Sequence, residues 1–310
     1  MLEPTTPATR AVAEVVAGYL AAMREAMGGV VEDADTERLH DFRVAVRRTR
    51  SALKLSRPVL DPATVRRHEA DGKRLGDLTT PLRDLDVHLL ALAAMRERLV
   101  AADATDLAPL EARLAARRRA AYRALVRALG TKRAQGFCAD WSPGLVTTAD
   151  DGSGTSAAQL SRRSIRRAHR RVVKAGSSVT ADCPAEDLHR LRKRCKELRY
   201  AVEMFSPLHD PGTTGKAVQD LKGLQDSLGR FQDAEVQQQT VRDIAEEMST
   251  ARAVRAPTLL AMGEVMTHLA ADQAAARVQL TDRFARLVRP KSTRRFRALA
   301  ALPRADEAAS

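Results

Sequence analysis

The sequence predicts an all-α protein made of two related helical halves. Apolar residues recur at the three- and four-residue spacing of amphipathic helices, and no stretch alternates in the manner of a β-strand. In addition, the stretch from Leu39 to Val87 matches the stretch from Leu188 to Val236 without a gap, at an offset of 149 residues. An offset shared by two helices and the turn between them indicates a duplication. Two copies of this length favour two tandem four-helix-type bundles over an array of short repeats.

Turn and capping residues predict where the helices of the first half begin and end. Gly28-Gly29 should end the first helix, and Pro58 should end the helix that carries His40. Asp61-Pro62 is typical of an N-cap followed by proline at the first helical position, and Thr79-Thr80-Pro81 should end that helix. The helices expected in this half span about residues 7–27, 36–57, 62–80, 83–101 and 107–129.

Residues 142–155 contain Ser-Pro-Gly and Asp-Asp-Gly-Ser-Gly, which are typical of a linker. This linker would separate a first half of about residues 7–141 from a second half of about residues 156–299, with residues 300–310 as a frayed tail. The second half should contain an arginine-rich helix at about residues 162–171 and the helix that carries His189. Further helices are expected at about 216–228, after residue 231 and at about 257–288, followed by a basic segment at 291–297.

Charge is the strongest compositional signal. The chain has 52 Lys and Arg against 39 Asp and Glu, a net charge of +13. Such a surplus predicts a polyanionic partner, which could be nucleic acid, an anionic membrane surface or a phosphate polymer. Aromatic residues make up only 3%, which argues against single-stranded nucleic acid held by base stacking.

The sequence also predicts a cytoplasmic location. Glu14 interrupts the early apolar run, so no signal peptide is expected. No apolar stretch reaches the length of a membrane span, so no membrane partner is expected. Cys138, Cys183 and Cys195 form no CxxC pair, which favours reduced thiols.

One expected helix carries a continuous stripe of basic side chains, because its cations recur at steps of three and four residues. This first stripe consists of His40, Arg43, Arg47, Arg50, Lys54 and Arg57. The second copy repeats the spacing with His189, Arg192, Lys196 and Arg199. Lys193 broadens the second stripe, since the equivalent residue of the first copy is Val44.

Three interpretations of the stripes compete. A solvated cationic face is the simplest, but like charges one turn apart destabilise a helix by a few tenths of a kcal/mol per pair, and a cost repeated in both copies suggests a use. A metal site is disfavoured, because the seven histidines form no HExxH or Cys/His ligand spacing and a cation among arginines would be repelled. We therefore expect no metal and no cofactor.

Anion binding is the interpretation that fits the stripes best. Arginine pairs with phosphate through two hydrogen bonds, lysine adds a point charge, and a protonated histidine adds another donor. The stripe advances by about 5–6 Å per helical turn. It therefore suits a ligand that carries negative charge at regular intervals.

The doubled pattern L-H-x-x-R-x-x-x-[RK]-x-x-R, followed by L-x-D and then D-x-[DE]-V, resembles the conserved histidine α-helical domain, or CHAD, family. The resemblance covers about residues 7–299 and implies two helical halves around a central basic channel that binds inorganic polyphosphate, without catalysis. Polyphosphate granules are a further expected partner. The motif positions expected to face polyphosphate are His40, Arg43, Arg47, Arg50, His189, Arg192, Lys196 and Arg199. Further basic residues expected at this ligand are Lys54, Arg57, Lys73, Arg119, Arg123, Arg166, Arg170, Lys193 and Lys222.

Two weaker motifs are interpreted as structural. Asp84/Asp86 and Asp233/Glu235 point about 200° apart on a helix, so neither pair can chelate one ion, and we expect them to act as caps or as ion-pair partners of the basic stripes. The segment 212–216 imitates a phosphate-binding loop, but its glycine spacing is too short and Ala217 replaces the required Ser or Thr.

Two alternatives to polyphosphate binding remain open. One is binding of the RNA or DNA backbone, although the stripes lack the Asn and Gln typical of base-edge readout, so sequence-specific recognition is not expected. The other is a phosphohydrolase or phosphotransferase that uses His40 and His189, although no acidic metal site accompanies them. The sequence does not determine chain-length preference, oligomeric state or physiological role.

Overall fold

The computed structural model describes residues 2–32, 36–132, 134, 136, 154–180 and 182–301. Within these ranges the regular structure is helical, apart from one isolated bridge between Pro7 and Ser156. The predicted all-α class is therefore confirmed. Most of the predicted linker at 142–155 and most of the predicted tail at 300–310 lie outside the described residues.

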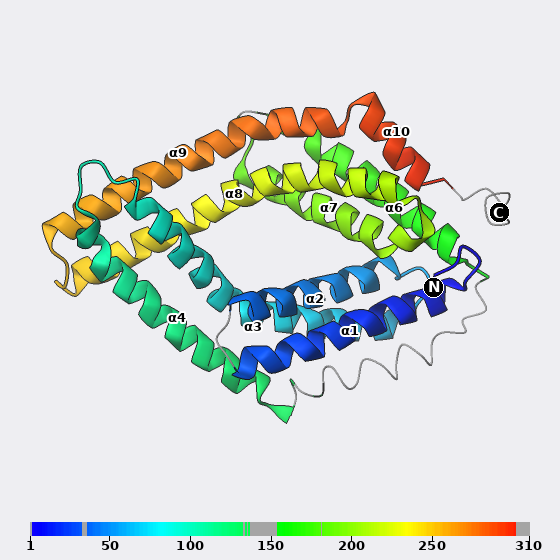
Figure 1. Ribbon diagram of the computed structural model, residues 1–310, viewed down its shortest axis with the longest axis horizontal. Helices are drawn as coiled ribbons and strands as arrows, with labels where there is room; N and C mark the ends of the chain where they lie inside the picture. The colour runs from blue at the N-terminus through cyan, green and yellow to red at the C-terminus, as the bar shows by residue number, and fades with distance from the viewer. Residues whose placement is uncertain are drawn as a thin grey trace.

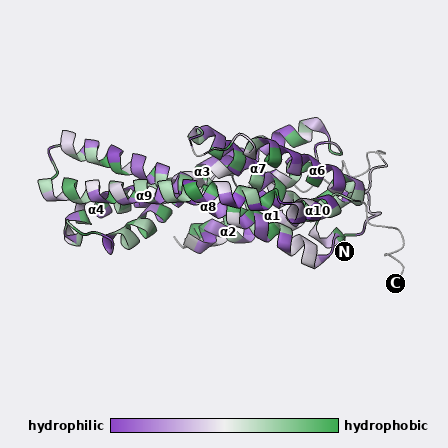
Figure 2. Cartoon of the chain, turned by 90° about the horizontal axis from the view of Figure 1, so that it is seen from above, coloured by the Kyte–Doolittle hydropathy of each residue, from purple (hydrophilic) through white to green (hydrophobic). Residues whose placement is uncertain are grey.

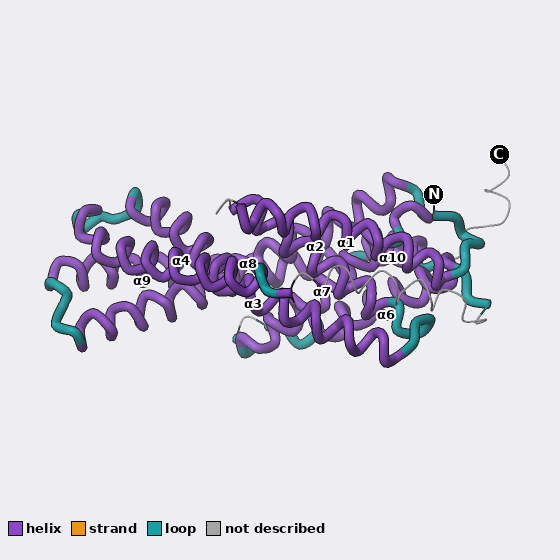
Figure 3. The backbone as a smooth tube through the Cα atoms, turned by 90° about the horizontal axis from the view of Figure 1, so that it is seen from below, coloured by secondary structure: helices purple, strands orange, loops and turns teal. Residues whose placement is uncertain are grey.

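The helices form a broad body and a narrower arm (Figures 1 and 3). The first half consists of α1 (Ala8–Glu32), α2 (Thr36–Leu55), α3 (Pro62–Arg96), the short η1 (Ala104–Leu107) and α4 (Ala108–Leu129). The second half consists of α6 (Ala157–Gly176), α7 (Ala185–Met204), η2 (Ser206–Leu208), α8 (Pro211–Thr250), α9 (Ala256–Leu287) and α10 (Pro290–Leu299). In Figure 1 α1 and α2 lie on one side of the body, α6 and α7 on the other, and α4 and α9 reach into the arm.

The helix bounds follow the offset found in the sequence. Helices α6, α7 and α8 each begin 149 residues after α1, α2 and α3, and α2 and α7 both have 20 residues. The side chains of Asp61 and Asp210 accept hydrogen bonds from the third residue beyond them, and proline follows each, so α3 and α8 begin with the predicted cap. A duplication would produce this correspondence, and we interpret the matching bounds in that way.

Three apolar cores hold the helices together. One lies among α1, α2, the beginning of α3 and the end of α4, includes the fully buried Phe42, and also takes in Leu160 of α6 and Phe205 beyond α7. A second lies among α6, α7, α10 and parts of α8 and α9, and includes Leu198. The third fills the arm and combines Leu92 and Leu110 of the first half with Ile244 of the second. The view in Figure 2 shows apolar residues interspersed with polar ones along the same helices, as amphipathic packing requires. The first and third cores thus combine residues of both halves, and the buried residues of the second core come from the second half.

The predicted helix break at Thr79-Thr80-Pro81 is wrong, because α3 continues through Pro81 to Arg96. Proline removes one backbone hydrogen bond and crowds the preceding turn. Here the hydroxyls of Thr79 and Thr80 donate to the carbonyl oxygen of Gly76 at 3.0 and 2.8 Å, so side chains supply hydrogen bonds in that turn. The separate helix expected at 83–101 is accordingly the second part of α3.

Two predicted breaks at glycine are also wrong. Helix α1 continues through Gly28-Gly29, where Val30 is buried on its core-facing side. Helix α8 continues through Gly229, between the buried Leu228 and Phe231, and so joins the two helices expected around that point. A glycine costs about 1 kcal/mol in a helix relative to alanine, and burial of one large apolar side chain contributes about 1.5–3 kcal/mol. Packing therefore outweighs the local preference.

We predict that the close contact between α6 and α9 makes Gly176→Ala destabilising. A Cβ at Gly176 would overlap the ring of Phe284, and overpacking costs about 1–3 kcal/mol. Gly18→Ala is the matched control, since nothing lies within 4 Å of its added Cβ and alanine favours the helix by up to about 1 kcal/mol. Urea denaturation should show opposite changes in the free energy of unfolding, and equal changes would contradict the prediction.

Candidate functional site

A cavity of about 640 Å³ lies between α2 and α3 of the first half and α7 and α8 of the second. Both halves contribute cations to its wall. These are His40, Arg43, Arg47, Arg83, Arg192, Lys196, Arg199 and Arg230. The two sequence stripes therefore meet in one cavity, which we call the first cavity.

Neutral groups hold the two equivalent arginines at the wall of the first cavity. The Arg43 guanidinium donates to the Thr79 and Thr80 hydroxyls at 2.7 and 3.1 Å. The Arg192 guanidinium donates to the Gln232 side-chain oxygen at 2.6 Å. These hydrogen-bond acceptors are uncharged, although the carboxyl groups of Asp84 and Asp233 lie near enough to attract Arg43 and Arg192 respectively. Part of the arginine charge is therefore left for a ligand.

A second cavity of about 560 Å³ continues from the first between α2, α3 and α7. The two share Arg47, Lys196 and Tyr200. The Nε of Arg47 donates to the Tyr200 hydroxyl at 3.2 Å, so this contact joins α2 to α7 between the two cavities. The additional cations of the second cavity are Arg50, Lys54, Arg57, Arg66, Lys73 and Lys193.

A third cavity of about 530 Å³ lies beyond the second, between the end of α2 and α6. It shares Ser51, Lys54, Arg57 and Glu197 with the second cavity. Its further cations come from the arginine-rich α6 and are Arg163, Arg166, Arg167, Arg170 and Arg171. The three adjoining cavities together form what we call the basic groove.

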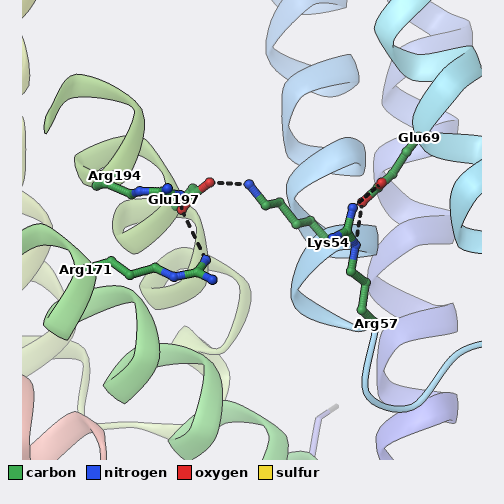
Figure 4. Close-up of polar contacts among 6 residues, drawn as sticks. All are labelled: Lys54, Arg57, Glu69, Arg171, Arg194 and Glu197. Atoms are coloured by element: carbon green, nitrogen blue, oxygen red, sulfur yellow. Dashed lines mark hydrogen bonds and ion pairs between the residues drawn. The ribbon is translucent and has the colours of Figure 1, made fainter. Parts of the chain in front are cut away.

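Two carboxylates partly neutralise the groove near its third cavity (Figure 4). Glu69 on α3 accepts hydrogen bonds from Arg57, one of them 3.0 Å from Nε. Glu197 on α7 forms an ion pair with Lys54 on α2. Each carboxylate therefore compensates its own partner, while the third cavity keeps an excess of cations.

Burial and the neighbouring cations together lower the pKa values of two basic groups in the groove. Burial, together with the nearby Arg192, Arg47 and Arg199, lowers the pKa of Lys196 to about 8. Burial and the neighbouring Arg47 lower the pKa of Arg43 to about 10. Both groups are held at an electrostatic cost, which a bound anion would relieve.

His40 and two carboxyl groups of the first cavity have shifted pKa values that favour their uncharged forms. Burial and the charges of Arg83 and Arg47 lower the pKa of His40. The carboxyl groups of Asp84 and Asp233 reach the solvent of the first cavity, and desolvation by its walls raises the pKa of both despite the nearby cations. Each shift favours the uncharged form of its group in the free protein.

The structure brings most of the predicted residues together in the groove. The whole first stripe lines it, as do Arg192, Lys196 and Arg199 of the second, and so do Lys73, Lys193, Arg166 and Arg170. Four predicted residues are exposed elsewhere, namely His189 on α7, Lys222 on α8, and Arg119 and Arg123 on α4. They do not line the three cavities.

Sequence reasoning missed several residues of the groove. Arg83 and Arg230 line the first cavity, and Tyr200 and Glu197 line the second. Glu197 and Tyr200 follow Lys196 directly on the helix of the second stripe, and Arg83 precedes Asp84, so sequence proximity was an available signal. No sequence signal showed that α3 and α8 would pack beside the stripes.

The seven histidines are dispersed over the structure. Besides His40 and His189, the ring of His169 stacks on Phe296 with centroids 4.9 Å apart, and His209 shares a hydrogen bond of 2.9 Å with Ser161. His68, His88 and His268 lie elsewhere on α3 and α9. Across the described ranges, no group of three or more His, Cys, Asp or Glu side chains could hold a metal ion.

The weaker motifs have structural positions. Asp86 is buried and pairs with Arg118 of α4 at 2.6 Å, so it holds the arm rather than a cation of the stripes. The segment 212–216 forms the beginning of α8. Cys183 and Cys195 are free and buried, and Cys138 lies outside the described residues. Among the helices described, none has both the length and the hydropathy needed to cross a membrane.

Over the residues that the structure describes, fold and site define a helical protein with a groove lined by cations from both halves of the chain. The family model described as the CHAD domain matches residues 14–242, which is most of the chain. The chain therefore belongs to the CHAD domain family. A search of curated proteins found no significant match.

Two solved structures are similar to the chain. The crystal structure of the CHAD domain from the plant Ricinus communis shares 27% identity and has a TM-score of 0.77, covering 92% of this chain and 93% of that chain. PptA from Streptomyces chartreusis shares 17% identity with a TM-score of 0.69, covering 90% of this chain and 100% of that one. At 17% identity, the match to PptA shows a shared fold and nothing more.

We predict that Lys196→Met stabilises the free protein. The pKa of Lys196 in the folded protein is about 8, below the ordinary value of about 10.4, so the unfolded chain binds more protons between these pH values. The wild type should therefore gain stability as the pH rises through that window, while the variant should not. At pH 7 the variant should be more stable by on the order of 1 kcal/mol, after solvent screening is allowed for.

Lys222→Met on the exposed face of α8 is the matched control. Urea denaturation from pH 7 to pH 10 should show a pH dependence like that of the wild type in this control. A Lys196→Met variant that is less stable than the wild type at pH 7 would contradict the prediction.

Proposed function

We propose that the protein binds inorganic polyphosphate along the basic groove. The observation that carries this proposal is the first stripe, which runs along α2 and ends at Arg57 in the turn beyond it, and all of whose residues line the three cavities. Cations of α7 and α6 face the same cavities. A flexible polymer with charge at every unit could contact them in succession. Membership of the CHAD family supports the proposal.

The lining of the groove favours polyphosphate over nucleic acid. Tyr200 is the one Tyr, Phe or Trp among the described lining residues. It is only 7% exposed and its hydroxyl is engaged by Arg47. Proteins that hold single strands without sequence preference use aromatic faces for stacking, and this groove offers donors for phosphate oxygens instead.

We further propose that polyphosphate is bound and not cleaved, in the cytoplasm and also at polyphosphate granules. His40 lines the first cavity, whereas His189 is exposed on α7 and lines none of the three cavities. The two histidines therefore do not converge on one ligand atom, as an acid and a base would need to. Incubation of the pure protein with polyphosphate should release no orthophosphate, and sustained release abolished by His40→Ala would contradict this.

The double variant Arg47→Gln/Lys196→Gln should bind long-chain polyphosphate at least about 100-fold more weakly, because hydrogen bonds to charged groups contribute about 1.5–3 kcal/mol each. Both residues line the first and second cavities. Calorimetric titration at several salt concentrations would measure the affinity. The wild-type affinity should fall steeply with salt, and the variant's salt dependence should be shallower.

The control for this experiment is Arg113→Gln/Arg117→Gln. It removes the same charge from α4, where both arginines pair with Glu247. Its affinity should stay within about twofold of the wild type, since surface ion pairs contribute little. Equal losses in both double variants would show that only net charge matters. RNA that displaces polyphosphate at equal phosphate concentration would favour the nucleic-acid alternative.

Binding should take up protons, so that affinity rises as the pH falls from about 8 to 6. The pKa of His40 is lowered in the free protein, and a bound polyanion should raise it. Asp84 and Asp233, whose pKa values are already raised, should respond in the same direction. One pKa unit corresponds to about a tenfold change in affinity.

Calorimetry in buffers of different ionisation heat would count the protons. His40→Gln should reduce the uptake, while His189→Gln, on the exposed face of α7, should leave it unchanged. Undiminished uptake in His40→Gln would show that this imidazole does not titrate with the ligand.

A further inference from the structure

Glu197 occupies an unusual place in the basic groove, because it lines both the second and the third cavity. Its side chain is 19% exposed and faces cations from three helices (Figure 4). Lys54 reaches it from α2, Arg194 lies 2.9 Å away on its own helix, and Arg171 of α6 lies at 3.8 Å. The carboxylate thus lies where these cations could otherwise bind a phosphate.

The charge of Glu197 is maintained at neutral pH. Burial by itself would raise its pKa, but the hydrogen bonds and charges of Lys54 and Arg194 outweigh burial and lower the pKa. A carboxylate that accepts several charge-assisted hydrogen bonds resembles a bound anion. Glu197 therefore competes with any phosphate that approaches the same three cations.

The ion pair between Lys54 and Glu197 also joins the two halves, since it runs from α2 to α7. Lys54 and Glu197 both line the second and the third cavity. The first cavity lies on one side of this pair, and the arginines of α6 in the third cavity lie on the other. A short anion can be held in the first cavity alone, whereas a long one must pass the pair to reach α6.

Building on the proposed function, we propose that Glu197 is a resident counter-anion that divides the groove and determines its chain-length preference. A polyphosphate that spans both parts takes Lys54 and Arg171 from Glu197, and its affinity is reduced by the contacts that Glu197 loses. A short chain that stays in the first cavity leaves the Glu197 contacts intact. Glu197 is thus a specificity-determining residue of the same site.

The test is the isosteric variant Glu197→Gln, titrated with long-chain polyphosphate and with tripolyphosphate. The affinity for the long chain should rise about tenfold, because a neutral amide holds Lys54 and Arg171 less strongly than a carboxylate. The affinity for tripolyphosphate should change by less than about twofold. The ratio of the two affinities is the diagnostic quantity, since a merely structural role would not change it in this direction.

Glu247→Gln is the matched control. Glu247 also bridges two arginines, Arg113 and Arg117, but it joins α8 to α4 and lies outside the cavities of the groove. Both variants raise the net charge by one, so a general charge effect would appear in both. Urea denaturation of each variant would confirm that it folds.

The outcomes separate this inference from the proposed function. If the wild type binds no polyphosphate, the proposed function fails and the inference fails with it. If the wild type binds and Arg47→Gln/Lys196→Gln weakens binding, the function stands. In that case, an unchanged or weaker affinity of Glu197→Gln for the long chain, or an equal gain for both ligands, would overturn the inference alone.

Discussion

Repulsion between two facing rows of positive charge is the constraint on which this structure depends. Helices α2 and α7 carry the rows, and the hydrogen bond from Arg47 to Tyr200 joins them directly. At the first cavity Arg43 and Arg192 donate to uncharged acceptors, the hydroxyls of Thr79 and Thr80 and the side-chain amide of Gln232, whereas Arg199 pairs with Glu203. Carboxylates in the place of those uncharged acceptors would hold Arg43 and Arg192 more strongly but would cancel more of their charge. The choice of acceptors keeps the groove both ordered and cationic.

The cost of that arrangement is visible in the lowered pKa of Lys196 and Arg43 and is offset elsewhere. Three apolar cores hold the helices together, and two of them combine buried residues of both halves. Carboxylates meet the stripes along the whole groove. Asp84, Asp226 and Asp233 line the first cavity, and toward α6 Glu69 and Glu197 pair with Arg57 and Lys54. Each of the three cavities nevertheless keeps more cations than carboxylates in its lining.

Sequence reasoning predicted the all-α fold class, many of the helix ends and most of the basic residues that line the groove. The stripe of α2 was predicted in full, because helical periodicity alone places those residues on one face. His189 has the same place in its own stripe as His40, yet it is exposed and His40 lines a cavity. The breaks predicted at Gly28-Gly29 and Pro81 failed, since local preference is smaller than the packing and hydrogen bonding that override it.

The sequence by itself determined the all-α class, the repeat at an offset of 149 and the two basic stripes, because all three depend only on spacing along the chain. Only the tertiary structure decided that the stripes face one groove, that Arg83 and Arg230 join them, and that Glu197 stands among the cations of three helices. These relations depend on how separate helices pack against one another. Spacing within a helix specifies which face a residue occupies, and it leaves open what that face meets.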